Sequence, residues 1–380
     1  MRSRTISFLL RCAFVGALCP PLAPAFAASA AEPRLDPAEQ ADPALRRQWL
    51  QLRAEAADPL TAPQLSRLKV LLSAHGWPTR PAADAEVINA AGELLLRASS
   101  DYDYQQEVID LVLARVDVDV DALAAATLND AIEIRGKQRQ QFGTFFRLEG
   151  GKVVASTPLE GYRYQRDLLG MPPLADHIAR LQARVDAGQS LAAAQASAPL
   201  ALPTYRPYQQ PQLRLELGEM IDREQRAREA YRTTVAAGKP DPALQAAIAQ
   251  VDDANVARVG AILDELGIPT PAMVGHDGVS TFFLLVQHSS QALQQRVLVM
   301  AEPQMEQRLM SRQQYAMLSD RVNIEQGRKQ LYGTQVRLEN GHVSLEPVED
   351  PEHLDQRRAG MAMGASADYL QRVQAQWAPR

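Results

Sequence analysis

The chain has 380 residues, with 40 lysines and arginines, 45 aspartates and glutamates, and a formal charge of -5. This weakly acidic balance excludes the electrostatics typical of nucleic-acid-binding proteins. Because 46% of the residues are hydrophobic and only 22% are charged, intrinsic disorder is excluded as well, and the length predicts two or three domains.

The first thirty residues have the pattern of a secretory signal peptide. Arginines precede or interrupt an apolar stretch from Ile6 to Leu18, and small residues then provide two predicted cleavage points, after Ala27 or after Ala30. The stretch is too short to span a bilayer as a stable helix. We therefore expect an exported protein, periplasmic or secreted, that is soluble and has no later membrane span.

Both cysteines, Cys12 and Cys19, lie inside this predicted leader. Its removal would leave 37 basic and 45 acidic residues, a charge of -8, and no thiol. That excludes disulfides, thiolate nucleophiles and cysteine-bound zinc or iron–sulfur clusters. We expect neither a metal nor a cofactor, because the histidines of the second half also lack the i, i+4 spacing of a helical metal site.

Two segments of the chain repeat one another. Residues 128–153 and 318–343 align without a gap at an offset of 190 and are identical at eleven of 26 positions. The same offset relates the Gly-Met pair at 170–171 to the one at 360–361. The sequence therefore predicts a tandem duplication.

The predicted first copy spans 36–187 and the second spans 213–380. The segment between them, 188–212, is rich in Ala, Pro and Gln, with a proline at every fourth position from Pro199 to Pro211. Such a composition cannot continue a helix and predicts a stiff linker.

Each copy begins with a helical pattern. Residues 64–74 place leucines at helical spacing and stop at Gly76, and residues 243–266 repeat the pattern and stop at Gly267. Further helices are predicted in the second copy at 279–288, 291–309 and 311–326.

The period then changes to that of strands. Residues 331–338 and 342–345 are predicted strands joined by an Asn-Gly turn, a strong hairpin signal, and Gly150-Gly151 stands at the same place in the first copy. Asp350 before a proline predicts an N-cap and a last helical stretch towards Trp377. The predicted fold class is mainly α (α+β): two tandem helical units, each with one small antiparallel β-hairpin.

The two copies differ in their polar residues. At the 190 offset, groups of the second copy face less polar or different ones in the first, in these pairs: Gln287 and Arg97, His288 and Ala98, Tyr332 and Phe142, Gln335 and Phe145, Arg357 and Asp167, Arg358 and Leu168. The first copy thus keeps the apolar framework and lacks several hydrogen-bonding groups. This pattern indicates a polar site in the second copy, and the alternative is drift in a surface region.

The same residues resemble an uncharacterised bacterial family of unknown function. The resemblance covers most of 241–370 and extends weakly to the first copy. Its motifs are Gln287-His288, Asp320-Arg321, Tyr332-Gly333-Thr334-Gln335, and Asp350 followed by Arg357-Arg358. It implies a domain and a set of motifs, and it implies no reaction.

His288 is the leading candidate for a general acid or base, because an imidazole changes protonation near neutral pH. The alternative is a satisfied core histidine or a cation at a helix end. Asp320 is a candidate to orient this ring, but Asp130 persists in the first copy, where Ala98 replaces the histidine. That persistence favours a structural role for Asp320.

Seven side chains are candidates for ligand binding. The arginines among them offer planar donors suited to a carboxylate or phosphate, whereas the alternative for any single arginine is a solvated helix face. No serine-hydrolase elbow, phosphate loop or dinucleotide motif occurs. The candidates are Gln287, Arg321, Gln330, Tyr332, Gln335, Arg357 and Arg358.

Three hypotheses for the function follow. The first is an exported protein whose second copy binds a small anionic or amide-bearing molecule, a peptide or a glycan. The second is a metal-independent hydrolase or lyase with His288 as the acid or base. The third is a structural envelope protein that offers two surfaces to partners. The sequence leaves the ligand, the reaction and the oligomeric state open.

Overall fold

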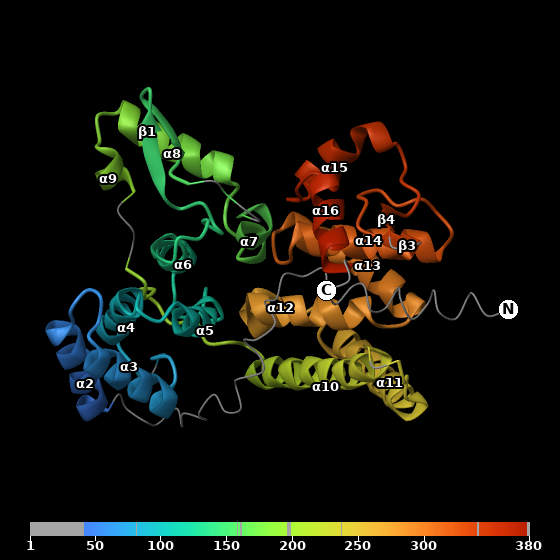
Figure 1. Ribbon diagram of the computed structural model, residues 1–380, viewed down its shortest axis with the longest axis horizontal. Helices are drawn as coiled ribbons and strands as arrows, with labels where there is room; N and C mark the ends of the chain where they lie inside the picture. The colour runs from blue at the N-terminus through green and yellow to red at the C-terminus, as the bar shows by residue number, and fades with distance from the viewer. Residues whose placement is uncertain are drawn as a thin grey trace. The chain divides into compact units, whose positions relative to one another are not determined.

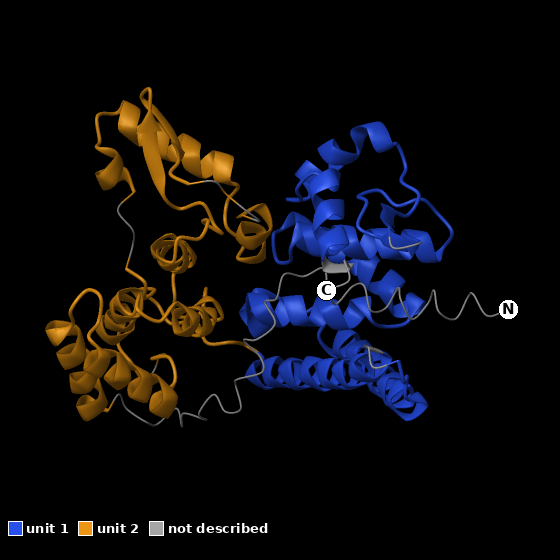
Figure 2. Cartoon of the chain, in the orientation of Figure 1, with its two compact units in different colours: residues 1–22, 210–380 blue, residues 23–209 orange. Residues whose placement is uncertain are grey.

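The structure is a computed structural model, which describes residues 42–377 except 81, 158, 160–161, 196–198, 237 and 340–341. The predicted signal peptide and the predicted Asn340-Gly341 turn lie outside the described residues. The chain forms two compact units that divide between Gln209 and Gln210 (Figure 2). We call the described residues up to 209 the N-unit and those from 210 the C-unit; they are orange and blue in Figure 2.

Both units are mainly helical, and each contains one two-stranded antiparallel sheet, which confirms the predicted fold class (Figure 1). The described elements of the N-unit are α2 (Pro43–Glu55), α3 (Ala62–His75), α4 (Ala85–Arg97), α5 (Tyr102–Leu113), α6 (Ala122–Arg135), β1 (Phe146–Glu149), β2 (Lys152–Ala155), α7 (Tyr162–Leu168), α8 (Leu174–Asp186) and α9 (Leu191–Ala194).

The C-unit begins with two long helices and ends with short ones. Its described elements are α10 (Pro211–Ala236), α11 (Pro242–Glu265), α12 (Pro271–Gln287), α13 (Gln291–Glu306), α14 (Arg312–Glu325), β3 (Val336–Glu339), β4 (His342–Leu345), the 3₁₀ turn η1 (Pro351–His353), α15 (Leu354–Gly360) and α16 (Ser366–Trp377).

The apolar periodicity of the helices becomes the core of each unit. In the C-unit, Val259 and Ile262 of α11 pack with Phe282 and Val286 of α12 and with Leu217 of α10. All five side chains are buried, and burying each contributes about 1.5–3 kcal/mol. In addition, α10 packs along both α11 and α12, and α11 packs against α12, so these three helices form one bundle. No helix among the described residues is both long and apolar enough to cross a membrane.

The two hairpins have the same register. Phe146 pairs with Ala155 in the N-unit, and Val336 pairs with Leu345 in the C-unit. The strand predicted over 331–338 is wrong in its first half, because β3 begins only at Val336. Side-chain hydrogen bonds hold the preceding residues in a loop, which is described below.

The end of the chain also differs from its predicted helix. Asp350 has a left-handed backbone (φ 45°), and its side chain makes no capping hydrogen bond to the helix that follows. Its carboxylate instead lies 2.9 Å from Nδ1 of His353. The single predicted helix is therefore three short elements, η1, α15 and α16.

Part of the proline-rich segment 188–212 is integrated into the N-unit. Leu200 and Ala201 are buried in its core, and the amide of Ala201 donates to Oδ1 of Asn89 at 3.0 Å. The amide of Arg206 donates to the carbonyl of Val118 at 2.7 Å. These contacts hold the segment against the N-unit until the units divide.

Gly333 provides a sharp test of the loop before the second hairpin. It has φ +62°, and an added Cβ would lie 3.2 Å from Leu345 and Leu354 side chains. We expect Gly333→Ala to lower the free energy of unfolding of the C-unit by about 1–3 kcal/mol, because strain and crowding coincide. Gly260 in α11 is the matched control: its Cβ would meet open space. Gly260→Ala should raise stability by about 0.5–1 kcal/mol in the same denaturant titration. A neutral Gly333→Ala would contradict the described backbone.

Candidate functional site

His288 lies at the C-terminal end of α12, where it is the cap residue. Its side chain is only 6% exposed, and Nδ1 hydrogen-bonds to Oε1 of Glu224, which is 1% exposed. Glu224 belongs to α10, which packs directly along α12. The structure therefore pairs the leading acid–base candidate with a buried carboxylate that the sequence analysis did not identify.

Glu224 is held by a small polar network between α10 and α11. Arg228 Nε donates to its Oε1 at 2.9 Å, and Asn255 Nδ2 donates to its Oε2 at 3.2 Å. Arg228 also donates to Asp252 at 2.8 Å. Burial alone would raise the pKa of Glu224, but His288 and Arg228 outweigh it and lower that pKa. The i, i+4 spacing of Glu224 and Arg228 on one helix was the available signal in the sequence.

Three buried polar atoms belong to residues at the end of α12 and in the first turns of α13. Gln287 Oε1, His288 Nε2 and Gln294 Oε1 have no hydrogen-bond partner among the described residues. Gln294 Nε2 donates to the carbonyls of Gln287 and Ser289, at 3.3 and 2.9 Å, and this fixes its Oε1 as the remaining acceptor. A buried polar atom without a partner costs about 1–3 kcal/mol. Gln304 Oε1 and Gln314 Oε1 of the C-unit are in the same position, but only at this junction of α12 and α13 do such atoms adjoin a buried Glu–His pair.

The lowered pKa of Glu224 predicts a pH dependence. Its ordinary value is 4.5, so the stabilisation is complete above that pH and is lost as the pH falls through the lower folded-state pKa. We expect the melting temperature of the C-unit to fall more steeply below pH 4.5 in the wild type than in Glu224→Gln. Asp252 acts in the opposite sense, because burial raises its pKa, but it is present in both proteins. Parallel curves from calorimetry at pH 3–6 would contradict the assignment.

Asp320 holds the loop that precedes the second hairpin. Its buried carboxylate accepts from the amides of Leu331, Tyr332 and Thr334 at 2.7–3.2 Å, and from the Thr334 hydroxyl at 2.9 Å. Burial raises its pKa, and these hydrogen bonds oppose the rise. Asp130 makes the same contacts to Gln141, Phe142 and Thr144 in the N-unit. Asp320 therefore holds the backbone of the loop at residues 331–334 in place, and no hydrogen bond joins it to His288.

Gln330 closes the same loop from the other side. It is fully buried, its Nε2 donates to the carbonyls of Gln335 and Glu346, and its Oε1 accepts from the amide of Gln335 at 2.8 Å. Gln140 bonds the backbone of Phe145 in the same manner. The side chain of Gln335 donates to the Thr334 hydroxyl at 3.2 Å. Gln330 is thus used entirely within the fold.

Arg358 has a counterpart in the N-unit that the sequence alignment missed. It is 2% exposed, and it donates to the carbonyls of Gly364 and Tyr332, at 2.7 Å in both cases. Arg166 donates in the same way to Pro172 and Phe142, at 2.8 and 2.9 Å. The pairing of Arg358 with Leu168 is therefore wrong, because the offset grows from 190 to 192 after the hairpin, where the chain is longer in the C-unit. The match of the Gly-Met pairs at 170–171 and 360–361 is wrong for the same reason, since the amides of Met171 and Met363 bond the carbonyls of Arg166 and Arg358.

Arg357 and Arg321 are the other two candidate arginines. Arg357 is half-buried and donates through Nε to the carbonyl of Leu331 at 2.8 Å, and through a terminal nitrogen to those of Glu349 and Asp350. Arg321 is buried in α14 next to Asp320. The donors of Arg357 and Arg358 are thus directed at backbone carbonyls, which limits what they can offer an anion.

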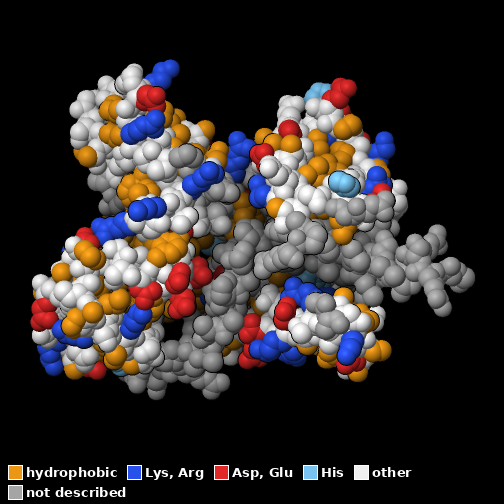
Figure 3. Space-filling model, viewed as in Figure 1, with side chains coloured by type: hydrophobic (Ala, Val, Ile, Leu, Met, Phe, Trp, Pro, Cys, Tyr) orange, Lys and Arg blue, Asp and Glu red, His pale blue; other side chains and the backbone are white. Residues whose placement is uncertain are grey.

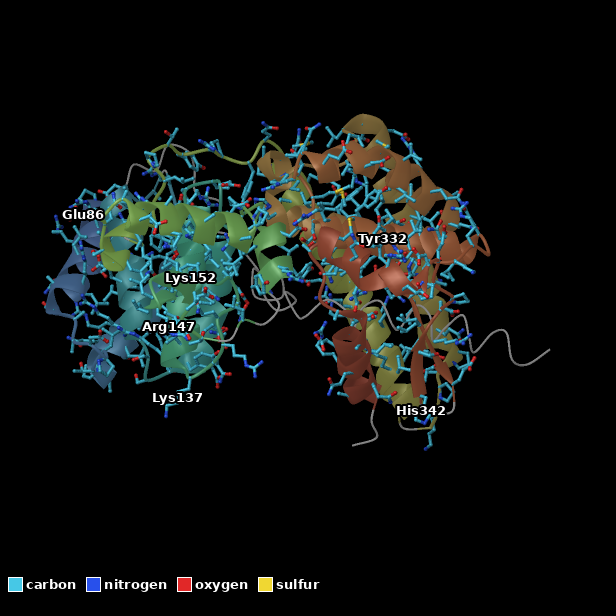
Figure 4. All side chains as sticks on the ribbon, turned by 90° about the horizontal axis from the view of Figure 1, so that it is seen from above. Glu86, Lys137, Arg147, Lys152, Tyr332 and His342 are labelled. Carbon is cyan, nitrogen blue, oxygen red and sulfur yellow. The ribbon has the colours of Figure 1, made fainter. Side chains whose placement is uncertain are left out.

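Tyr332, labelled in Figure 4, is half-buried and packs against the buried cluster of Ala316, Met361 and Met363. Burial and the nearby Asp320 raise its pKa, and Arg357 opposes this.

The hydrogen bonds described above divide the predicted site into two groups. Tyr332, Gln335, Gln330, Asp320 and the two C-terminal arginines surround one loop, whereas Gln287 and His288 lie at the α12–α13 junction.

The described residues contain no group of three or more His, Cys, Asp or Glu side chains arranged to hold a metal. In Figure 3, charges of both signs are interspersed with hydrophobic side chains on the visible face of each unit. This face therefore favours neither a positively nor a negatively charged partner. The candidate site is thus the Glu224–His288 pair with its neighbouring amides.

The C-unit is a helical domain with a braced hairpin loop and a buried Glu–His pair. Residues 211–378 match DUF6624, a family of unknown function. The predicted resemblance of this region to such a family is confirmed at that level. No curated protein and no solved structure matches the chain.

Proposed function

We propose that the C-unit binds a small amide-bearing ligand at the α12–α13 junction. The observation that supports this most is the set of three buried atoms without a partner, Gln287 Oε1, His288 Nε2 and Gln294 Oε1. Nearly all buried polar atoms in folded proteins have a hydrogen-bond partner. Three such atoms without a partner therefore support a place for the polar atoms of another molecule.

The chemistry of these atoms favours a ligand that donates hydrogen bonds. Glu224 takes up Nδ1 of His288, so Nε2 is the ring atom left for a ligand, and an amide, which both donates and accepts, can pair with it. The two glutamine oxygens are acceptors. An N–H group of an amide or amine complements them, whereas a carboxylate or phosphate does not. Because Arg357 and Arg358 bond backbone carbonyls, the amide-bearing class is better supported than the anionic one.

A thermal-shift panel tests the proposal. The full chain would be heated with glutamine, N-acetylglucosamine and acetylated dipeptide amides, and with lactate, glucuronate and phosphate as anionic comparisons. We expect the amide compounds alone to raise the melting temperature, because a ligand that binds only the folded state stabilises it. The shift should vanish in His288→Ala, which has the residue of the N-unit at this position, and persist in the exposed control His353→Ala. A shift that survives His288→Ala, or no shift with any amide, would reject the site.

A second candidate function is acid–base catalysis, which the Glu224–His288 pair specifically favours. A carboxylate on Nδ1 fixes the tautomer of the ring and stabilises its protonated form, as in many hydrolases. His288 would then transfer a proton through Nε2 to a bound amide or ester. The test is turnover of amide and ester reporters, where His288→Gln should abolish the rate while the ligand-induced thermal shift remains. Equal rates in both proteins would exclude this role.

We also propose that the protein is exported and then lacks residues 1–27 or 1–30. The support is the arginine-flanked apolar stretch and the small residues that follow it. Intact mass and N-terminal sequencing of the periplasmic fraction should show a chain that begins at Ala28 or Ala31. This chain should not react with thiol reagents in denaturant, because Cys12 and Cys19 are gone. A full-length chain in the cytoplasm would refute export.

We propose, finally, that the two units descend from one duplicated unit. The identical hairpin registers support this, as do the recurring hydrogen bonds of Asp130 and Asp320 and of Arg166 and Arg358. Isolated expression of residues 210–380 tests the independence that duplication implies. We expect a single cooperative unfolding transition from this fragment.

A further inference from the structure

The first two helices of the C-unit are longer than their counterparts in the N-unit. α10 and α11 have 26 and 24 residues, whereas α2 and α3 have 13 and 14. The two pairs nevertheless begin alike: Arg214 of α10 bonds Asp277 in the first turns of α12, and Arg46 of α2 bonds Asp84 at the start of α4. They also end alike, since a glycine follows α11 and α3 within two residues. The additional 23 residues of the C-unit therefore lie between these ends, where α10 leads into α11.

α12 covers only the first half of α10. Near the start of both helices, Arg214 donates to the carbonyl of Val274 at 2.8 Å, and further along Glu224 bonds His288 at the C-terminal end of α12. Beyond this contact α10 continues for twelve residues, to Ala236, which is about 18 Å at the rise of an α-helix. α11 packs along it as the second helix of a hairpin (Figure 1). We call residues 225–236 and 242–254 the arm.

One line of side chains along α10 follows the alternating four- and three-residue steps of a coiled coil. Beside α12 these side chains are at most 5% exposed, whereas in the arm they are only half-buried. The buried members are Leu213, Leu217, Met220 and Glu224, and the half-buried ones are Ala227, Tyr231 and Thr234. On α11, Leu244, Ile248 and Val251 are spaced alike and half-buried, whereas Asn255 and Val259 are buried. None of the described side chains between 225 and 254 is buried.

This difference in burial follows from where α12 ends. A seam between two helices becomes a closed core only when further helices cover it, and α12 does so for the first half of α10 alone. In the arm, Tyr231, Leu244 and Ile248 therefore stay half-open to solvent, and Val235 is 48% exposed. The N-unit has the same framework without an arm. The arm thus gives the C-unit an apolar surface that this framework does not need.

The two helices of the arm carry opposite charges. The α10 segment has three arginines and one glutamate, whereas the α11 segment has Asp252 and Asp253 and no basic residue. The side chains of Arg226 and Arg232 are 75% and 65% exposed. A partner of one charge would match only one of these helices. A second arm, related by a two-fold axis, would place each α10 beside α11 of the other copy, and both contacts are then attractive.

We propose that the arm packs against the arm of a second copy of this chain, and that the four helices form an antiparallel bundle. The cores of such bundles are built from the same alternating four- and three-residue spacing. The second arm supplies the cover that α12 gives to the first half of α10, and it closes the seam at Tyr231, Leu244 and Ile248. Glu224 and His288 lie at the base of the arm and take no part in this contact, so the dimer and the ligand site are tested separately.

Sedimentation equilibrium of the full chain under reducing conditions tests this pairing, and we expect twice the mass of one chain. The double variant Arg226→Glu, Arg232→Glu should raise the dissociation constant at least tenfold, a loss of about 1.4 kcal/mol of binding free energy, because like charges then meet across the bundle. Adding Asp253→Arg should recover part of the affinity, since the charge pattern is then reversed on both helices. The matched control is Arg47→Glu, an exposed position of α2, which should leave the dissociation constant unchanged.

A further variant tests the seam itself. Tyr231→Lys places a charge in the core of the bundle, whereas on a single arm the ammonium reaches water. We expect a monomer with the helical circular dichroism of the wild type. Two results would overturn the proposal: a wild-type chain that is still a monomer at about 100 μM, and a dimer whose dissociation constant is the same in the wild type and in the variants of the arm.

Discussion

Asp320→Ala is expected to lower the free energy of unfolding of the C-unit by about 3–5 kcal/mol, because it leaves several buried donors without an acceptor. The amides of Leu331, Tyr332 and Thr334 all point at this one carboxylate, which is 0% exposed. The amide and hydroxyl of Thr334 are buried, so they cannot reach water unless the loop opens. Denaturant titration of the wild type and the variant measures the loss.

The N-unit offers a matched experiment. Asp130 is equally buried and accepts from the equivalent amides, so Asp130→Ala should destabilise its own unit by a similar amount. Asp264 is the surface control, since it is 69% exposed and pairs with Arg296, and Asp264→Ala should cost less than about 1 kcal/mol. If Asp320→Ala is as mild as Asp264→Ala, the carboxylate does not brace the loop.

Glu224→Ala is expected to have an effect of similar size, about 3–5 kcal/mol, because one partner of a buried charge network is removed. His288, Arg228 and Asn255 each direct a hydrogen bond at this carboxylate. Without it, the arginine retains Asp252, but the ring and the amide have no acceptor in its place. The loss should appear in the C-unit transition.

Glu216 provides the control on the same helix. It accepts two hydrogen bonds from Arg258 of α11, but it is 37% exposed and therefore open to water. Glu216→Ala should cost less than about 1 kcal/mol. A second comparison is Glu224→Gln, which keeps an acceptor oxygen and should recover part of the stability. Equal losses in the variants of Glu216 and Glu224 would show that burial does not matter here.

The helical elements were predictable because their signals are local. Apolar spacing and a following glycine placed the helix of residues 62–75 and the one of 242–265 within two residues of their observed ends. The hairpin strands at 336–339 and 342–345 were placed by their short extended pattern. The loop at 331–335 was missed, since an extended run predicts a strand, whereas Asp320 takes the amides that a strand partner would use.

The candidate site was less predictable, because its residues meet across helices. Comparison of the copies identified His288, but nothing in the sequence joined it to Glu224, 64 positions earlier. The comparison also overvalued Arg358, whose counterpart Arg166 is displaced by two residues. An ungapped alignment pairs residues of the two copies by their position number alone. In the structure, equivalent arginines are recognised by the backbone carbonyls to which they donate.

The sequence alone determined the composition limits, the mainly helical class with small hairpins, and the recurrence of one pattern along the chain. These follow from local periodicity and residue identity, which need no knowledge of distant contacts. Only the tertiary structure decided which polar groups are used within the fold and which remain available. Asp320, Gln330 and Arg358 are consumed by backbone groups, while His288 and its neighbouring glutamines keep buried atoms without a partner. Hydrogen-bond satisfaction is a property of three-dimensional packing, and for this reason residue types alone could not show which polar groups brace the fold.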